Sequence, residues 1–432
     1  MTQFTWISYL AARQALAARL ADPNNVFWTD AENKLYLLEA LRTWNALTEQ
    51  WNASFAFTAT SASVWYSLAT LSGSPRLRTL ADSDLYTIME AHLLEPMTGG
   101  TWTGTSQFSI ADLQGALQRR RDEMIQVSGC NLAQLPLLPT AANTRRTFFP
   151  DSTLEPRRAR FIPDSTSGPI TLSREDTLGF GAFEPSYLQT TKLPSAWSVI
   201  TGPPLAMDVD TAPGVTGNYD VLSLQAGLSF NPPASTLLGV PDDWAWLAKW
   251  GALADLLSRD SEATDRPRAA YCLQRYQDGL KIMKASNWLI SATIGGITVD
   301  TPSVRVMDGT APEWENNAFA WPDLVTAGMD LFAPCPVAAS SGVTMIVVGN
   351  APIPILDGDY VQVSRDAFDT ILDYAQVLAS FKMGGAEFAS TQDLEKKFFA
   401  MAMQTNQRLS KLGLFSDMVH LEGKRQDINQ PR

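Results

Sequence analysis

Hydrophobic residues recur at three- and four-residue steps in several stretches, which is the spacing of an amphipathic helix. This spacing predicts helices over residues 4–21, 30–51, 83–95 and 109–127. Thr29 and Glu32 have the spacing of a capping box at the second helix, and Ser109 and Asp112 mark the start of the last one. We therefore expect a helical unit at residues 1–130.

The pattern changes after residue 130. Residues 131–170 contain six prolines and few periodic apolar positions, which predicts an extended connector that crosses a surface. Residues 170–240 have the glycine and proline punctuation of short strands and long loops. Residues 131–240 are thus expected to form a Pro/Gly-rich connector and a β-rich segment.

Helical spacing returns twice in the second half. We expect a helical hairpin at 241–287, a β-rich segment at 288–363, and a C-terminal hairpin with a polar tail at 364–432. Ser390 and Asp393 have the spacing of a cap for the last helix. Residues 244–260 and 368–384 align at an offset of 124, either as an internal repeat or through a shared hairpin geometry. The expected fold class is α+β, with helical hairpins or a bundle and interspersed β-rich segments.

Composition narrows the class of protein. The 432 residues are 45% hydrophobic and 18% charged, as in ordinary globular chains, and include 13 Trp and 19 Phe, which supply core and contact area. A net charge of −12 argues against wrapping nucleic acid as a whole. Cys130, Cys272 and Cys335 lie far apart, which favours reduced, buried thiols in a protein that folds in a cytosol. The sequence shows neither the pattern of a signal peptide nor a long apolar run, so we expect no membrane partner.

Reactive groups are sparse. The two histidines, His92 and His420, lack metal-ligand spacing, and neither a phosphate loop, a dinucleotide fingerprint nor a nucleophile elbow is present. The acid pairs Asp208/Asp210 and Asp357/Asp359 favour turns over cation sites. We expect no catalytic, cofactor-binding or metal-binding residue, and a protein that is not an enzyme. A tail-associated polysaccharide-degrading enzyme is the alternative, although long β-repeats are missing.

Arginine is concentrated in one segment. Residues 119–160 contain eight arginines against four acids, in a chain that is acidic as a whole. The segment is a solvated connector, a docking arm for an acidic neighbour, or the lining of a DNA channel. As a docking arm, it predicts that charge reversal at Arg157 and Arg158 weakens assembly while thermal unfolding stays nearly unchanged. The candidate contact residues in it are Arg145, Arg146, Arg157, Arg158 and Arg160.

Two blocks of sequence resemble a known family. LADPNNVFWTDAENKLYLLEALRTWNALTEQW (20–51) and ILDYAQVLASFKMGGAEFASTQDLEKKFFAMAMQTNQRL (371–409) are similar to the opening and closing helical hairpins of head-to-tail adaptor (connector) proteins of tailed bacteriophages. The resemblance covers about a third of the chain, which is longer than usual adaptors. It implies aromatic contact residues at Phe27, Trp28, Trp44 and Trp51.

The resemblance also implies a place in the virus. An adaptor of this kind forms a dodecameric ring beneath the portal protein, contacts tail or nozzle proteins, and lets genomic DNA pass without sequence-specific binding. It resides in the neck of the virion, after assembly in the host cytoplasm. Another structural component of the tail or baseplate is the alternative reading.

Overall fold

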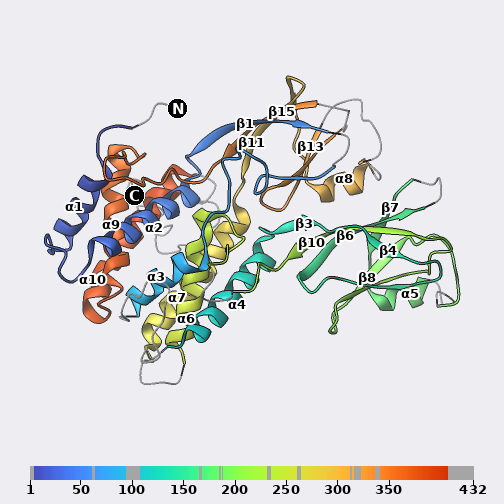
Figure 1. The fold of residues 1–432 in the computed structure, drawn as a ribbon, viewed down its shortest axis with the longest axis horizontal. Coiled ribbons are helices and arrows are strands. Elements are labelled where there is room, and N and C mark those ends of the chain that lie inside the picture. Colours follow the sequence, from blue (N-terminus) through green and yellow to red (C-terminus); the bar gives the residue numbers. More distant parts are fainter. Residues whose placement is uncertain are drawn as a thin grey trace, which may run out of the picture.

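The computed structural model describes residues 4–60, 64–93, 108–164, 168–183, 186, 188–230, 235–259, 264–311, 314–315, 323–335 and 341–406. The fold is mixed α+β, which confirms the predicted class at that level. Helices gather at one end of the long axis and a large sheet at the other, with two smaller sheets beside them (Figure 1).

The helices come from three separate parts of the sequence. We call them together the helical body: α1 (Tyr9–Arg19), α2 (Asp30–Thr48), α3 (Asp82–His92), α4 (Ile110–Ser128), the 3₁₀ turn η1 (Asp242–Trp244), α6 (Ala245–Leu257), α7 (Arg266–Ala285), α9 (Arg365–Ser380) and α10 (Gly385–Thr405). Helix α2 packs against α9 and α10, and α4 packs against α6 and α7. One hydrophobic core extends from Tyr9 to Met403. The segment boundaries expected from the sequence therefore fall where the secondary structure changes. They do not divide the core, because the helical segments pack around one shared core.

Two predicted helix starts are confirmed. The Thr29 hydroxyl accepts from the Glu32 amide at 3.2 Å, and Glu32 accepts from the Thr29 amide at 2.7 Å. Ser109 accepts from the Asp112 amide at the start of α4. The predicted cap at Ser390 is wrong, because α10 already begins at Gly385 after a left-handed Gly384.

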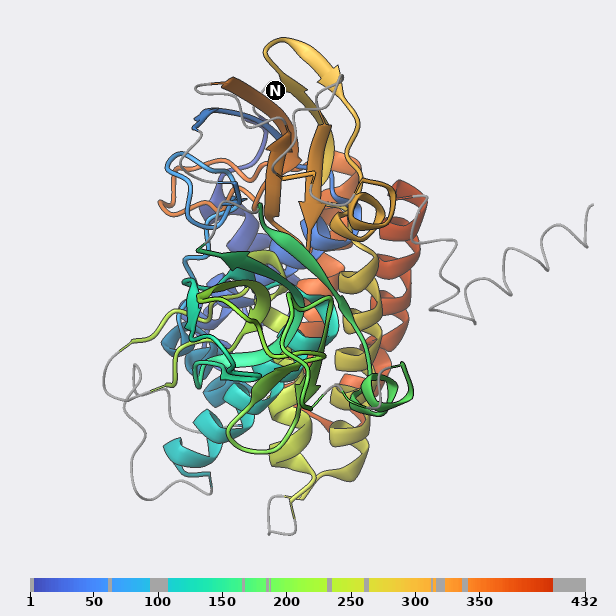
Figure 2. The same cartoon turned by 90° about the vertical axis from the view of Figure 1, so that its right-hand side faces the viewer.

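The large sheet has eight strands formed by consecutive sequence: β3 (Leu132–Gln134), β4 (Leu138–Thr140), β5 (Arg146–Phe148), β6 (Thr153–Pro163), β7 (Ile170–Arg174), β8 (Ala196–Ile200), β9 (Ala206–Val209) and β10 (Gly217–Gln225). Their order is β3-β10-β6-β7-β8-β9-β5, with β4 also on β10, and the short helix α5 (Thr177–Phe183) lies on β8. Figure 2 shows this sheet in front of the helical body.

The predicted extended connector is therefore wrong for residues 131–170. Ala159 and Phe161 of β6 are fully buried in a second core with Trp197 and Tyr219. Pro163 ends β6, and Pro156 lies beside a bulge, and both are positions where a sheet accommodates proline. The prolines thus fit a sheet that composition alone did not indicate.

Two smaller sheets cover the rest. One has the order β1 (Asn52–Ala59), β15 (Ser341–Val348), β11 (Leu289–Ile294), β12 (Ile297–Val299). The other contains β13 (Asp323–Ala327), β14 (Leu331–Cys335) and β2 (Tyr66–Ser67), with α8 (Val304–Thr310) against β13. Each combines strands from the first 70 residues with strands from beyond residue 288.

Cys130 and Cys272 are buried free thiols, as expected from the sequence. Burial raises the pKa of Cys272 to about 12. The side chain of Cys335 and the whole of His420 lie outside the described residues.

Candidate functional site

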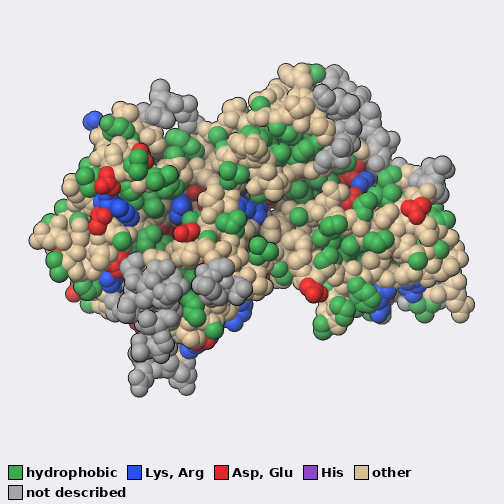
Figure 3. All heavy atoms as spheres, viewed as in Figure 1, with side chains coloured by type: hydrophobic (Ala, Val, Ile, Leu, Met, Phe, Trp, Pro, Cys, Tyr) green, Lys and Arg blue, Asp and Glu red, His purple; other side chains and the backbone are tan. Residues whose placement is uncertain are grey.

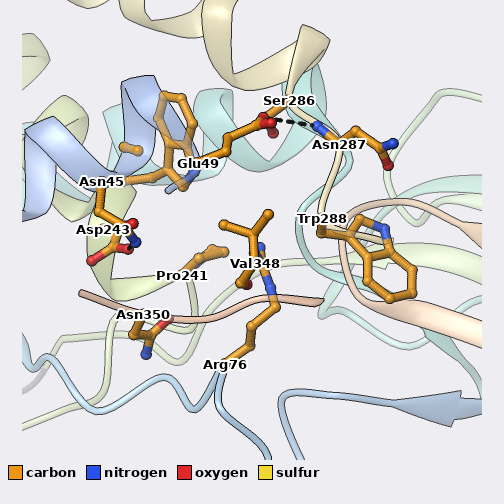
Figure 4. Close-up of a pocket in the computed structure, with 12 residues that line it drawn as sticks. Asn45, Glu49, Arg76, Pro241, Asp243, Ser286, Asn287, Trp288, Val348 and Asn350 are labelled. Atoms are coloured by element: carbon orange, nitrogen blue, oxygen red, sulfur yellow. Dashed lines mark hydrogen bonds between the residues drawn. The ribbon is translucent and has the colours of Figure 1, made fainter. Parts of the chain in front are cut away.

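A polar cavity lies where the helical body meets the four-stranded sheet (Figure 4). Its volume is about 20 Å³, which is room for one or two water molecules. The lining comes from distant segments, and its polar members are Asn45, Glu49, Arg76, Asp243, Ser286, Asn287 and Asn350. The cavity is too small for an organic substrate.

Arg76 enters this cavity from the segment between β2 and α3. Its side chain is buried, and Nη1 donates to the Val348 carbonyl at 2.9 Å. Nε and Nη2 have no hydrogen-bond partner within the described part of the chain. Burial lowers the pKa of Arg76. Buried donors of this kind are usually satisfied by ordered water, which the cavity can hold.

Asp243 lies on another wall of the cavity, next to Asn45 (Figure 4). Its carboxylate accepts from Nδ2 of Asn45 at 2.6 Å and from the amide of Ala351 at 3.0 Å. Burial raises the pKa of Asp243 to about 6. These bonds tie α2, η1 and the chain after β15 together, so the cavity is a structural joint.

A second buried polar group lies inside the helical body. Nζ of Lys249 is 2.5 and 2.6 Å from the carboxylate oxygens of Glu39, and 3.3 Å from Nε2 of His92. All three side chains are buried. Burial, together with the Lys249 charge, lowers the pKa of His92 well below its ordinary value. His92 is therefore a neutral core residue.

The two acid pairs noted in the sequence bind groups of this chain. Asp208 accepts from Arg146 at 2.8 and 3.0 Å. Asp357 pairs with Arg13, and Asp359 accepts from two backbone amides at 2.7 and 2.8 Å. The turn predicted at residues 357–358 is confirmed. Among the described residues, no group of three or more His, Cys, Asp or Glu side chains could hold a metal ion.

Phe27 and Trp28 lie in the loop between α1 and α2, which we call the Phe27 loop (residues 22–28). Asp22 accepts from the amides of Val26, Phe27 and Trp28 at 2.9, 2.7 and 3.0 Å. These hydrogen bonds from the backbone lower the pKa of Asp22, and the bond from the Val26 amide has the largest effect. Asn25 has a left-handed backbone with φ 53°, which is uncommon outside glycine.

The same loop is fixed to the turn between α9 and α10. The Trp28 indole is buried and donates to the Ala379 carbonyl at 3.1 Å. Nζ of Lys382 donates to the Phe27 carbonyl at 3.0 Å and lies 4.7 Å from the Phe27 ring centroid. Phe27 remains 45% exposed and Val26 82% exposed. The loop is thus rigidly held while it displays two apolar side chains.

The other two predicted aromatic contact residues are less accessible. Trp44 is buried and its ring lies 5.6 Å from that of Phe398 in α10. Trp51 is half-buried at the start of the four-stranded sheet. Trp28 and Trp44 therefore belong to the core of the helical body.

The arginines of the predicted docking arm bind this chain's own groups. Arg158 and Arg160 are buried in β6 and share the buried Glu315, with Asp308 and Asp220 as further partners. Their assignment to an interface is corrected, because their charges are already compensated inside the chain. Arg145 donates to the Val209 carbonyl at 3.1 Å. Arg146 and Arg157 stay exposed, paired with Asp208 and Glu155.

Comparison of the sequence with protein-family models and with curated proteins finds no match. None of the described helices is both long and apolar enough to span a membrane.

Proposed function

We propose that this chain is a structural subunit of a tailed-phage particle. Copies assemble side by side into a ring, expected to be dodecameric, at the head–tail junction. The ring joins the portal to tail or nozzle proteins and keeps the DNA channel continuous. In this arrangement the helical hairpins make the contacts within the ring, and the β-rich parts project toward other components.

The observation that supports this proposal is the Phe27 loop. Exposed apolar side chains on a rigid support are what a binding surface needs, because little conformational entropy is lost when a partner covers them. Asp22, the buried Trp28 and Lys382 restrict the loop, and their joint effect is to hold Val26 and Phe27 in solvent. Hydrophobic side chains also reach the surface elsewhere, over the helical body and the sheets (Figure 3). In the Phe27 loop, the backbone that carries Val26 and Phe27 is held by hydrogen bonds to Asp22.

The test is the mass and symmetry of the assembly. We expect native mass spectrometry and negative-stain images of the purified chain, alone and with a portal protein, to show a closed ring of about twelve copies. Val26→Ser with Phe27→Ser should shift the population toward monomers. Leu188→Ser is the matched control, since Leu188 is 65% exposed at a site outside the helical body.

Two outcomes would contradict the proposal. A wild-type chain that stays monomeric with every particle component would remove the ring. Rings of six or fewer copies, or hundreds of copies per particle, would instead favour another tail, baseplate or decoration component.

A further inference from the structure

An apolar recess lies at the C-terminal end of α2, between that helix and the segment that precedes α9. Its volume is about 320 Å³, and its lining includes Phe4, Leu41, Trp44, Trp51 and Val363. Trp51 is half-buried and Phe4 is 40% exposed, so part of this apolar surface is open to solvent. We propose that residues 412–415 of the same chain, Leu-Gly-Leu-Phe, fill the recess. The inference concerns another surface than the Phe27 loop and does not depend on the proposed ring.

The lining of the recess is held by hydrogen bonds from side chains. Gln362 accepts from the amide of Phe4 at 3.0 Å and donates to its carbonyl at 3.1 Å, which fixes the N-terminal segment on one side. The Trp44 indole donates to the side chain of Gln50 at 3.3 Å on the other side. A surface that is already formed loses little conformational entropy when it is covered, so an apolar segment that reaches it can be retained.

The C-terminal segment starts beside this recess. Helix α10 ends at Thr405, and the side chain of the buried Asn406 donates to the Leu47 carbonyl, in the last turn of α2, at 2.9 Å. Leu47 and Trp51 are four residues apart, so their Cα atoms are separated by at most about 15 Å. An extended chain covers this distance in about five residues. Residues 407–432 lie outside the described residues, and the first of them that can reach the recess are therefore those near position 412.

The sequence after Asn406 has the order that this arrangement needs. Residues 407–411, Gln-Arg-Leu-Ser-Lys, are mainly polar, and the apolar residues 412–415 follow directly. Helices α2 and α10 both end here without a basic residue in the last turn. Arg408 and Lys411 come next to these two carbonyl ends, where the helix dipoles favour positive charge.

The covalent link decides between this chain and a second copy. A short linker gives the attached segment an effective concentration in the millimolar range at the site that it can reach. The segment of another copy would have to compete with it from dilute solution. The occupant is thus the chain's own residues 412–415, which tie the end of α10 to the end of α2 and to the N-terminal segment.

The inference is tested with a thiol in the recess of the full chain. Gln50→Cys places it there at an exposed position, and Cys335→Ser is added, while Cys130 and Cys272 are buried. We compare its alkylation rate by a maleimide with that in the same chain carrying Leu412→Ser, Leu414→Ser and Phe415→Ser. The unaltered tail should slow the reaction at least about tenfold, the factor for a recess that is occupied nine-tenths of the time.

A matched control lies in the same tail. Met418→Ser, Val419→Ser and Leu421→Ser remove three apolar side chains that follow the proposed segment, and alkylation should stay as slow as with the unaltered tail. Hydrogen exchange in the chain without any substitution gives an independent measurement, since the amides of residues 412–415 should exchange more slowly than those of residues 418–421.

A disulfide identifies the chain that supplies the segment. Gln50→Cys with Phe415→Cys should form an intrachain disulfide, seen as a single chain in non-reducing electrophoresis. Gln189→Cys with Phe415→Cys should form none, because Gln189 is exposed in the part of the chain that forms the eight-stranded sheet.

Three results would overturn the inference. Equal alkylation rates with the unaltered tail and with the serine variant at 412, 414 and 415 would show that this segment does not cover the recess. Equal acceleration by both serine variants would assign the protection to the tail as a whole. A disulfide-linked dimer in place of the intrachain product would show that the segment enters the recess of a second copy.

Discussion

Arg157 and Arg158 are neighbours in β6, and their environments are opposite. Leu222 of β10 pairs with Arg158, and Ser223 pairs with Pro156, so Arg157 is the extra residue of a bulge. The bulge turns Arg157 into solvent, where its side chain is 45% exposed, and leaves Arg158 buried. A run of arginines in the sequence does not reveal this difference, because it depends on the register with β10.

The register leads to different expectations for the two charge reversals. Arg158→Glu would leave Glu315 and Asp308 beside a third carboxylate, so we expect the free energy of unfolding to fall by about 3–5 kcal/mol, the range for a broken buried pair. Arg157→Glu, the matched control, should change it by less than about 0.5 kcal/mol. Urea unfolding of both variants measures this. Equal, small losses would mean that Arg158 is not buried as described. This replaces the expectation that both reversals leave unfolding nearly unchanged.

At the scale of elements, the two late helix pairs meet at equivalent positions. The Tyr271 hydroxyl in α7 donates to the Glu395 carboxylate in α10 at 2.8 and 2.9 Å. Arg275 lies 4.9 Å from the ring centroid of Phe399. Both contacts join residues 124 positions apart, the same offset that aligns residues 244–260 with 368–384. Equivalent positions touch only close to an axis that relates the two hairpins, and both an internal repeat and a shared hairpin geometry would give this packing.

The Lys249–Glu39 pair links α6 to α2 inside the core. Glu39→Gln would leave the Lys249 ammonium buried without a counter-charge, and we expect a loss of about 3–5 kcal/mol in unfolding free energy. The double change Glu39→Leu with Lys249→Met removes both charges, and it should recover most of that loss. Chemical denaturation of the three proteins tests this. A double variant as unstable as Glu39→Gln would show that the loss comes from packing.

Helices were predictable from the sequence to a larger extent than the sheet. The stripes of α2 and α4 and the caps Thr29 and Ser109 are local signals, and the structure confirms them. The strands β3 to β6 were missed because prolines and arginines in their sequence resemble a solvated connector. In β6, the buried Arg158 and Arg160 are compensated by the carboxylate of Glu315, which lies 157 residues after Arg158. Pairing over such a distance leaves no periodic signal.

At the scale of the whole molecule, the cavity at the joint could not be predicted from the sequence either. Asn45, Arg76, Asp243 and Asn350 come from four segments that only the tertiary fold brings together. In contrast, the exposed Phe27 came from a local motif, and the structure keeps it at the surface.

The raised pKa of Asp243 makes this joint sensitive to pH. The carboxyl has an ordinary pKa of 3.8 and a folded-state pKa of about 6, so between these values the folded chain holds a proton that the unfolded chain has released. The stability from this group is therefore fully present below about pH 4 and is lost as pH rises through 6. The expected loss is on the order of 3 kcal/mol.

Comparison with Asp243→Asn isolates this effect, because asparagine does not titrate. The difference in unfolding free energy, wild type minus variant, should decrease between pH 4 and pH 7. A difference that increases over the same interval would mean that the folded state prefers the ionised carboxylate, contrary to its burial.

The way the helical body closes has a consequence for synthesis. Trp28 donates to Ala379, and Asn406 donates to Leu47, across separations of 351 and 359 residues. A nascent chain cannot make these contacts until α9 and α10 have left the ribosome. The eight-stranded sheet, by contrast, has a core of its own built from residues 132–225, so it can fold while translation continues. During that interval the apolar faces of α1 and α2 remain uncovered, and they become candidates for chaperone binding.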